Sequence, residues 1–143
     1  MNTEYKNNRD MNVSPEVSPE FVPAIRLISK LDRSCTFEAG TIPTLAHIHA
    51  NVFWISNRTE EWEKDTHVAP RKQYVVTIKG VVRFKVTDGS TFIIEPGIIL
   101  LAEDVEGDGH SWDIIEGKEW IRLYIPMAEN ADDFFTPSNT RRL

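Results

Sequence analysis

The amino-acid sequence predicts an all-β protein built as one domain. Its 143 residues are enough for one domain with a hydrophobic core. From residue 21 onward, short segments rich in β-branched and aromatic residues alternate with turn signals at a spacing of roughly 8–12 residues, which indicates a sandwich or a barrel. None of these segments keeps the hydrophobic period of a long amphipathic helix.

The predicted strands share short runs of apolar, β-branched or aromatic residues. In chain order they are "AIRLISK" (24–30), "AHIHANVFWIS" (46–56), "QYVVTIKG" (73–80), "VVRFKVTDG" (81–89), "STFIIEPG" (90–97), "IILLAED" (98–104), "HSWDII" (110–115) and "EWIRLYIP" (119–126). Turns are expected at Lys79-Gly80, Asp88-Gly89 and Glu116-Gly117-Lys118. "NRTEEWEKD" (57–65) and "NADDFF" (130–135) are each long enough for one helical turn.

The two ends of the chain differ from this pattern. Residues 1–20 are polar and contain the tandem "VSPEVSPE" (13–20), which predicts an extended or disordered arm. The alternative is a strand that swaps onto a partner subunit. The β domain is therefore expected over 21–128, followed by a C-terminal tail over 129–143.

Charge and composition restrict the function. The formal net charge is −6, and no basic stripe is present, which argues against nucleic acid and anionic membranes as partners. No apolar run reaches the roughly 20 residues of a membrane helix, and the N-terminus lacks the apolar stretch of a secretion signal. The single cysteine, Cys35, excludes an internal disulfide. These observations favour a cytoplasmic protein.

Two spaced groups of residues resemble the motifs of the cupin superfamily. In the first group, His67 lies six residues before Gln73 and Gly80 lies seven residues after it, at the places of a histidine, a glutamate and a glycine in cupins. In the second group, His110 follows Pro96-Gly97 by thirteen residues. The resemblance covers residues 68–125 well and 21–56 loosely.

The resemblance implies a single-domain cupin-type double-sheet jelly-roll barrel, preceded by the flexible N-terminal arm. "HVAPRKQYVVTIKG" and "PGIILLAEDVEGDGH" are similar to a narrower group of cupins to which no reaction is attached. Many cupins pair through their sheets, so the resemblance also implies a homodimer.

The metal site that the resemblance implies, three histidines and a glutamate, is incomplete in this chain. Gln73 replaces the glutamate, and Ala69 stands at the second histidine. A neutral amide is a weak ligand, and two imidazoles alone seldom hold a divalent ion tightly. The remaining candidate ligands are His67, Gln73 and His110. The choice between a divalent ion (Zn, Fe, Mn or Ni) and no cofactor is left open.

His47 and His49 are further candidate ligands, in "AHIHANVFW". Residues two apart on a strand point to the same side, so both imidazoles could enter the lumen of a barrel. The alternative is a solvated or merely packed face.

His67 and His110 are also the main candidates for acid–base chemistry. An imidazole has an unperturbed pKa near 6.5 and exchanges protons at neutral pH. Inside a barrel a neutral imidazole needs a hydrogen-bond partner, which Gln73 or Tyr124 could provide.

Three charged side chains complete the candidate site. Arg71 shares a strand face with Gln73 and could bind a substrate carboxylate or phosphate. The alternative for Arg71 is an ion pair with Glu103 or Asp104. One of these two carboxylates, of which Glu103 is the candidate chosen here, could enter the pocket as an acid, a base or a ligand. The alternative is a solvated acidic turn.

The aromatic residues are abundant, and the cysteine is isolated. Trp54, Trp62, Trp112 and Trp120 either fill the core or form an apolar wall for a ring-shaped ligand.

Arg122 and Tyr124 alternate with apolar residues on the last predicted strand and could line the same cavity. Cys35 has no basic neighbour beyond Arg33, so a catalytic thiol is not expected.

The expected function is a small-molecule enzyme of the cupin type. A pocket with imidazoles, a carboxylate and a reduced metal set suits a lyase or isomerase that acts on a compact organic metabolite by proton transfer. Two alternatives remain: a metal-dependent cupin that acts as an oxygenase or Lewis-acid enzyme, and a non-catalytic barrel that binds or senses a ligand.

Overall fold

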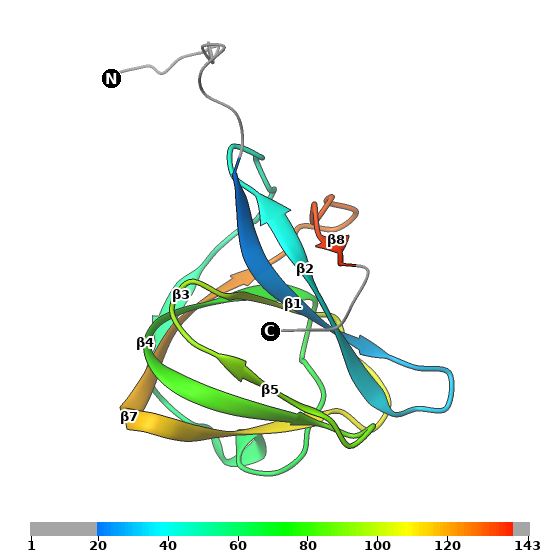
Figure 1. The fold of residues 1–143 in the computed structure, drawn as a ribbon, viewed down its shortest axis with the longest axis vertical. Helices are drawn as coiled ribbons and strands as arrows, with labels where there is room; N and C mark the ends of the chain where they lie inside the picture. The colour runs from blue at the N-terminus through cyan, green and yellow to red at the C-terminus, as the bar shows by residue number, and fades with distance from the viewer. Residues whose placement is uncertain (1–19, 139–143) are drawn as a thin grey trace.

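The computed structural model of the chain describes residues 20–138. These residues form eight strands and one short 3-10 helix, so the predicted all-β class is confirmed (Figure 1). No helix in this part of the chain is long and apolar enough to span a membrane. The predicted N-terminal arm lies outside the described residues except for residue 20.

The strands form one mixed sheet. They are β1 (Phe21–Ser29), β2 (Cys35–Pro43), β3 (Trp54–Ser56), β4 (Gln73–Val86), β5 (Thr91–Ile94), β6 (Ile99–Ala102), β7 (His110–Pro126) and β8 (Thr136–Pro137), with the 3-10 helix η1 (Glu61–Glu63) between β3 and β4. The order is β3-β7-β4-β6-β1-β2-β8, and β5 pairs with β4. The β1–β6 pair is parallel, and the other pairs are antiparallel. Because β3 and β8 do not pair, the sheet is open, and a closed jelly-roll barrel stays a prediction.

β4 and β7 are longer than the sequence predicts. The turns expected at Lys79-Gly80 and at residues 116–118 are wrong, because both strands continue through these positions with shifts of register. Gly80 has φ +103, and a Cβ there would lie 2.5 Å from the carbonyl oxygen of Glu119. The glycine signals therefore mark bulges rather than turns. Bulges bend a strand, and Figure 1 shows β4 and β7 curving together.

Other predicted elements have mixed outcomes. The turn at Asp88-Gly89 is confirmed between β4 and β5. The helical turn in 57–65 is also confirmed, as η1. The strand predicted over 46–56 is reduced to Trp54–Ser56 and one isolated bridge at Ala50.

The helical turn expected over 130–135 is absent, and the segment has no helical residue. The carboxylates of Asp132 and Asp133 instead accept hydrogen bonds from the backbone N–H groups of Phe134 and Phe135, at 2.8 Å in each case. Such side-chain bonds favour a turn over a helix. β2 was not predicted, because "CTFEAGTIP" lacks a continuous apolar run.

Strand alternation sends side chains to two faces of the sheet. The inner face carries the main core, which includes Ile25, Leu27, Val75, Phe84, Leu100 and Trp120. The outer face carries a smaller cluster of Ala24, Ile42, Tyr74, Leu101 and Phe135. The residue after β6 on the outer side is Glu103, and the next residue, Asp104, returns to the inner side.

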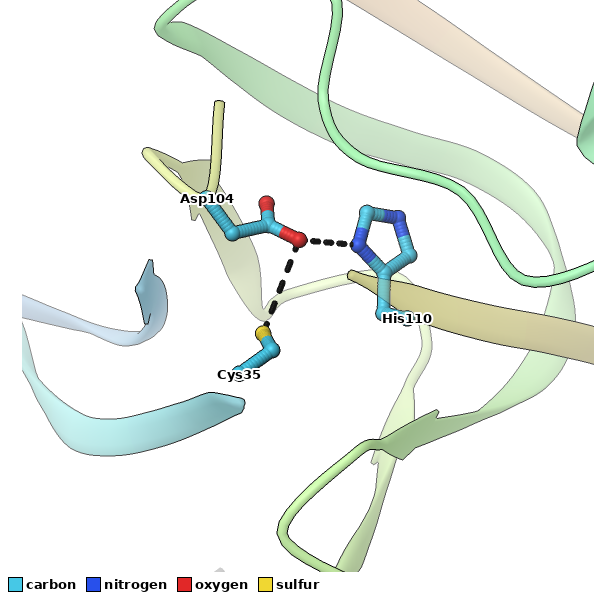
Figure 2. Close-up of side chains that lie close together, drawn as sticks. All are labelled: Cys35, Asp104 and His110. Atoms are coloured by element: carbon cyan, nitrogen blue, oxygen red, sulfur yellow. Dashed lines mark hydrogen bonds and ion pairs between the residues drawn. The ribbon is translucent and has the colours of Figure 1, made fainter. Parts of the chain in front are cut away.

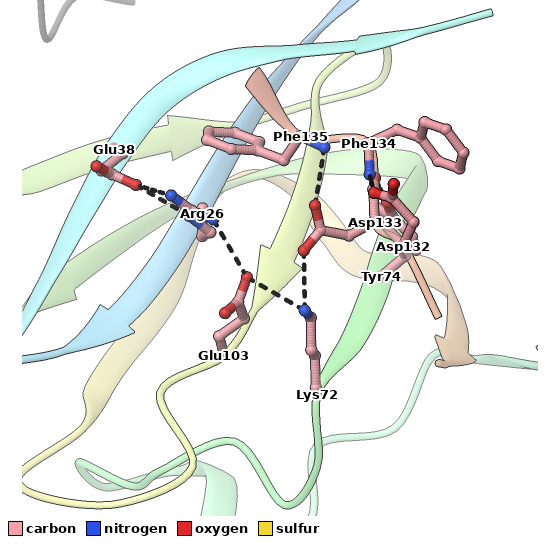
Figure 3. A network of polar contacts seen from close by, with 9 residues as sticks. All are labelled: Arg26, Glu38, Lys72, Tyr74, Glu103, Asp132, Asp133, Phe134 and Phe135. Carbon is pink, nitrogen blue, oxygen red and sulfur yellow. Dashed lines mark hydrogen bonds and ion pairs between the residues drawn. The ribbon is translucent and has the colours of Figure 1, made fainter. Parts of the chain in front are cut away.

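A charged network lies on the outer face, formed by Arg26, Glu38, Lys72, Glu103 and Asp133 (Figure 3). Lys72 Nζ lies 2.8 Å from Asp133 Oδ2 and 3.7 Å from Glu103 Oε2. Arg26 Nη1 lies 3.7 Å from the same Glu103 oxygen. We call these five residues the outer-face network.

The outer-face network fastens the last described segment to the sheet. The Tyr74 hydroxyl donates a hydrogen bond to the carbonyl oxygen of Asp133, and the Arg26 guanidinium lies 4.6 Å from the Phe135 ring centre. Burial alone would raise the pKa of Asp133, but the hydrogen bonds from Lys72 and the Phe135 backbone outweigh it and lower that pKa. The segment predicted as a tail is thus packed on the sheet up to residue 138.

Candidate active site

A pocket of about 290 Å³ opens on the inner face. Five of the predicted site residues line it, namely His67, Arg71, Gln73, His110 and Tyr124. All four tryptophans of the chain line it as well. Its deep wall consists of core side chains such as Val75, Phe84 and Leu100. The pocket is therefore lined by apolar and polar side chains in similar proportion, and sites that bind small molecules combine both kinds.

His67 and His110 come together through their backbones. They form an isolated antiparallel bridge in which each N–H donates to the other residue's carbonyl oxygen, at 2.8 Å in both cases. Gly109 makes this approach possible: it has φ +82, and a side chain there would run into the backbone of His67. The two imidazole rings meet edge to face, with centroids 4.6 Å apart.

Asp104 lies beneath His110 and is fully buried, with 0% of its surface exposed. Its Oδ2 is 2.5 Å from Nδ1 of His110 (Figure 2). Because a carboxylate accepts hydrogen bonds, we assign the imidazole proton to Nδ1. In the neutral form of the ring, Nε2 then carries the lone pair, and Figure 2 shows Nε2 on the side of the ring away from Asp104.

Cys35 is the second partner of Asp104. Its Sγ lies 3.5 Å from the same oxygen, Oδ2, and 1% of the residue is exposed. Burial, followed by the charge of Asp104, raises the pKa of the thiol well above its ordinary value. The thiol therefore stays protonated and donates to the carboxylate, which agrees with the expectation that it is not a nucleophile.

His67 is held in the same tautomer as His110. Its Nδ1 lies 2.8 Å from the carbonyl oxygen of Asp65, which can only accept, so Nδ1 carries the proton. Burial lowers the pKa of His67, and the neighbouring His110 adds to this effect, although the bond to Asp65 acts in the opposite direction. At neutral pH the ring is uncharged. Trp62 packs edge-on against it, with ring centroids 5.0 Å apart.

A buried ion pair closes one wall of the pocket. Arg122, 1% exposed, donates through Nε to the Tyr124 hydroxyl at 2.9 Å, and its Nη2 lies 3.4 Å from Glu63 Oε2. The Arg122 guanidinium also lies 4.5 Å from the Trp120 ring centre. Burial raises the pKa of Tyr124, so its hydroxyl stays neutral. Glu63 belongs to η1, so the ion pair fixes that short helix to β7.

The strand face expected to carry both Arg71 and Gln73 is not formed, because Arg71 precedes β4, which begins at Gln73. Arg71 Nη1 donates to Gln73 Oε1 at 3.0 Å, and its guanidinium lies 5.6 Å from the Trp54 ring centre. The alternative pairing with Glu103 or Asp104 is not formed: Glu103 lies between Arg26 and Lys72, and Asp104 binds His110. No ion pair of Arg71 occurs among the residues that the structure describes.

Three predicted site residues lie elsewhere. Glu103 lies in the outer-face network and does not line the pocket. His47 and His49 are exposed and also lie outside the pocket lining. The shared strand face expected for these two histidines does not exist, because their segment is not a strand.

Asp104, Cys35 and Glu63 are the polar residues that complete the site. Asp104 was the alternative to Glu103 in the sequence analysis, and Cys35 and Glu63 were not predicted as site residues. Strand alternation could have identified Asp104, since Leu100, Ala102 and Asp104 are two residues apart and Leu100 and Ala102 both line the pocket. Cys35 and Glu63 are far from His110 and Arg122 in sequence, and no motif spacing connects them.

One group of side chains in the described part of the chain could hold a metal ion. Cys35, Asp104 and His110 place one ligand atom each within 4.8 Å of one another. The donor set fits a metal only after the thiol and Nδ1 lose their protons, because a metal binds the thiolate and the deprotonated imidazole nitrogen. The set predicted from the sequence, His67, Gln73 and His110, shares the pocket and stays a prediction.

The arrangement can accept and return protons. Two imidazoles, each with Nδ1 bound to an acceptor, belong to one partly apolar pocket. No model of a known protein family matches the sequence. Searches of curated proteins and of solved structures likewise give no match. The likeness to cupins therefore rests on motif spacing alone, and the site must be interpreted from its own geometry.

Proposed function

We propose that this protein is an enzyme that moves a proton on a compact organic metabolite, as a lyase or isomerase (a dehydratase, isomerase or cyclase). The observation that carries the proposal is the buried hydrogen bond from His110 Nδ1 to Asp104 at the wall of the pocket. A carboxylate at Nδ1 orients an imidazole and stabilises the imidazolium that forms when Nε2 takes up a proton.

The proposed reaction uses the residues in distinct roles. Nε2 of His110 removes a proton from a carbon next to a carbonyl or carboxyl group, and the C–H electron pair moves toward that group. The His110 imidazolium then returns the proton to another carbon in an isomerisation, or to a departing hydroxyl in a dehydration. The N–H groups of Gln73 would stabilise the negative charge. The Tyr124 hydroxyl donates to Glu63 Oε2 at 3.3 Å, so Tyr124 would help only to orient the substrate as part of the pocket wall. His67 is a second base within the pocket.

The resemblance to cupins supports this class of reaction, since cupins include lyases and isomerases. We extend the proposal to the finer fold, a cupin-type jelly-roll barrel, and to a homodimer. A solved structure of the protein tests whether the sheet closes into a jelly-roll barrel. Light scattering tests whether the protein is a homodimer.

Solvent hydrogen exchange tests the proposal on a panel of candidate substrates. Small hydroxy acids, keto acids and unsaturated acids are each incubated with the protein in D₂O, and deuterium at carbon is read by NMR and mass spectrometry. The proposal expects at least one compound to exchange or convert. His110→Gln should abolish the reaction and Asp104→Asn should lower its rate by about two to four orders of magnitude, whereas the exposed control His49→Gln should retain it.

A ligand that stabilises the protein but is recovered without deuterium would instead support the binding or sensing alternative. Conversion that survives in both His110→Gln and Asp104→Asn would contradict the roles given to these residues.

A metal-dependent enzyme is the second candidate, and the Cys35–Asp104–His110 group favours it. These residues would hold a divalent ion, which would supply Lewis-acid chemistry. Metal analysis of the purified protein separates the two candidates. A stoichiometric ion that is lost in Asp104→Asn, together with activity restored by adding back that ion, would replace the metal-free proposal.

A further inference from the structure

Arg71 gives the pocket a positive charge that no described residue neutralises. We infer that the ligand of this pocket is a small, flat monocarboxylate, with its carboxylate on Arg71 and its apolar body between the tryptophans. That this ligand is also the substrate rests on the proposed function. That it binds here rests on the residues of the pocket alone.

The two arginines of the pocket differ in the hydrogen-bond and ion-pair partners of their guanidinium groups. Arg122 is buried, and its donors are taken up by Glu63, by Tyr124 and by backbone carbonyl oxygens. Arg71 is exposed and makes one hydrogen bond, to Gln73, while its remaining N–H groups have no carboxylate in the described part of the chain within ion-pair distance. Only Arg71 is therefore free to bind an incoming anion.

The charge balance of the pocket favours one negative charge on the ligand. Glu63 is matched by Arg122 at 3.4 Å, and Glu60, which also lines the pocket, lies 3.5 Å from Arg58. Among the side chains that line the pocket, the cation that remains unmatched is Arg71. A phosphate dianion would bring a second negative charge close to these two carboxylates, which costs free energy.

The geometry of Arg71 suits a carboxylate. Its guanidinium lies 5.6 Å from the Trp54 ring centre, and Nη1 is tethered to Gln73. A guanidinium that is held in place by a ring and a hydrogen bond loses less freedom when it binds. Its planar fork matches the two oxygens of a carboxylate with two parallel hydrogen bonds.

The walls of the pocket select a flat body. Trp54 is packed on Tyr124 with ring centroids 5.5 Å apart, and Trp112 meets Trp120 edge-on at 4.7 Å. Together with Trp62, these rings line the pocket. Aromatic walls bind planar, unsaturated or ring-shaped groups through stacked and edge contacts. A volume of about 290 Å³ suits a ligand of roughly the size of a substituted benzoate.

Tryptophan fluorescence measures binding directly, because every tryptophan of the chain lines the pocket. The probes are benzoate, its neutral analogue benzamide, and inorganic phosphate. We expect benzoate to quench or shift the emission with saturation, and to bind at least tenfold more tightly than phosphate. Arg71→Gln should lower the affinity for benzoate by at least about tenfold. It should change the affinity for benzamide by less than about threefold.

Two further variants make the result specific. Arg71→Lys keeps the charge without the fork, and it should bind benzoate with intermediate affinity. Arg83→Gln removes an arginine of β4 that is paired with Asp113 outside the pocket, and it should bind like the original protein. Circular dichroism melting shows whether each variant is folded.

Equal benzoate affinity in Arg71→Gln and the original protein would overturn the inference, as would tighter binding of phosphate than of benzoate or no binding of benzoate. Failure of the proposed function gives a different result: benzoate and substituted carboxylates bind through Arg71, but no carboxylate gains deuterium at carbon. In that case the carboxylate site stands and the proton-transfer role of His110 does not.

Discussion

Asp104 Oδ2 lies 2.5 Å from His110 Nδ1, and both side chains are buried. Asp104 lies in the connection between β6 and β7, and His110 is the first residue of β7. The backbone bridge between His110 and His67 fixes this end of the connection. The imidazole is therefore held from two sides, by its ring and by its backbone. A base oriented in this way loses little entropy when it meets a substrate.

The first prediction separates the two neighbouring carboxylates. Asp104→Asn should lower the turnover of any proton-transfer substrate by about two to four orders of magnitude, because an amide cannot stabilise the His110 imidazolium as a carboxylate does. Glu103→Gln should leave turnover unchanged, because Glu103 lies in the outer-face network. The measurement is deuterium exchange at saturating substrate. Equal losses in the two variants would contradict the assignment of Asp104.

The second prediction concerns the thiol that supports Asp104. Cys35→Val replaces the donor with an apolar group of similar volume, so Asp104 loses a hydrogen bond while it stays buried. We expect a loss of about 1.5–3 kcal/mol in the free energy of unfolding, and a smaller loss in Cys35→Ser, whose hydroxyl can donate. Urea unfolding at pH 7 measures both. A valine variant as stable as the original protein would show that the thiol gives Asp104 no support.

The third prediction concerns the close approach of the histidines. Gly109→Ala should destabilise the protein by at least about 2 kcal/mol, because the new methyl group would collide with the His67 backbone. The matched control is Gly89→Ala: Gly89 has φ +99, but a Cβ added there would meet no atom within 4 Å, so about 1 kcal/mol is expected from backbone strain alone. Urea unfolding compares the two, and equal losses would argue against the tight bridge.

The fourth prediction concerns acid stability. The folded-state pKa of Asp133 is lowered below its ordinary 3.8, so its ionised form stabilises the fold above that pH. The contribution is lost as pH falls below 3.8 through the folded-state pKa. Asp133→Asn should therefore be less stable than the original protein at pH 5, and the difference should shrink by pH 3.

Asp113→Asn is the control for this effect, because it removes one negative charge from an exposed side chain that pairs with Arg83 at 3.8 Å. Its stability difference from the original protein should be small at both pH values. Thermal melting at pH 5, 4 and 3 gives the comparison. A difference for Asp133→Asn that stays constant with pH would mean that the outer-face network does not depend on an ionised Asp133.

The strand pattern of the sequence predicts much of the fold because strand alternation and turn residues are local signals. Apolar runs locate β1, β4, β5, β6 and β7, and Asp88-Gly89 marks a real hairpin. Lys79-Gly80 misleads because a glycine with positive φ serves a bulge as well as a turn. Only the pairing of β4 with β7 decides between the two, and this pairing is not local.

The candidate site is predictable where one strand carries it and unpredictable where distant segments meet. Arg71 and Gln73 are close in sequence and both line the pocket, although Arg71 lies just before β4 and not on it. The choice of Glu103 over Asp104 was wrong, because it assigned the odd-numbered residues at the end of β6 to the inner face. The contact between Cys35 and Asp104 joins residues 69 positions apart, which no spacing rule reveals.

Long-range ¹H–¹⁵N NMR of the histidine rings tests most directly whether His110 is a base supported by Asp104. At pH 7.5, the His110 spectrum should show a protonated Nδ1 and an unprotonated Nε2, and Asp104→Ala should abolish this preference. A His110 ring that carries its proton on Nε2 in the original protein would contradict the proposed proton transfer, because the nitrogen on the side away from Asp104 would then have no lone pair to offer.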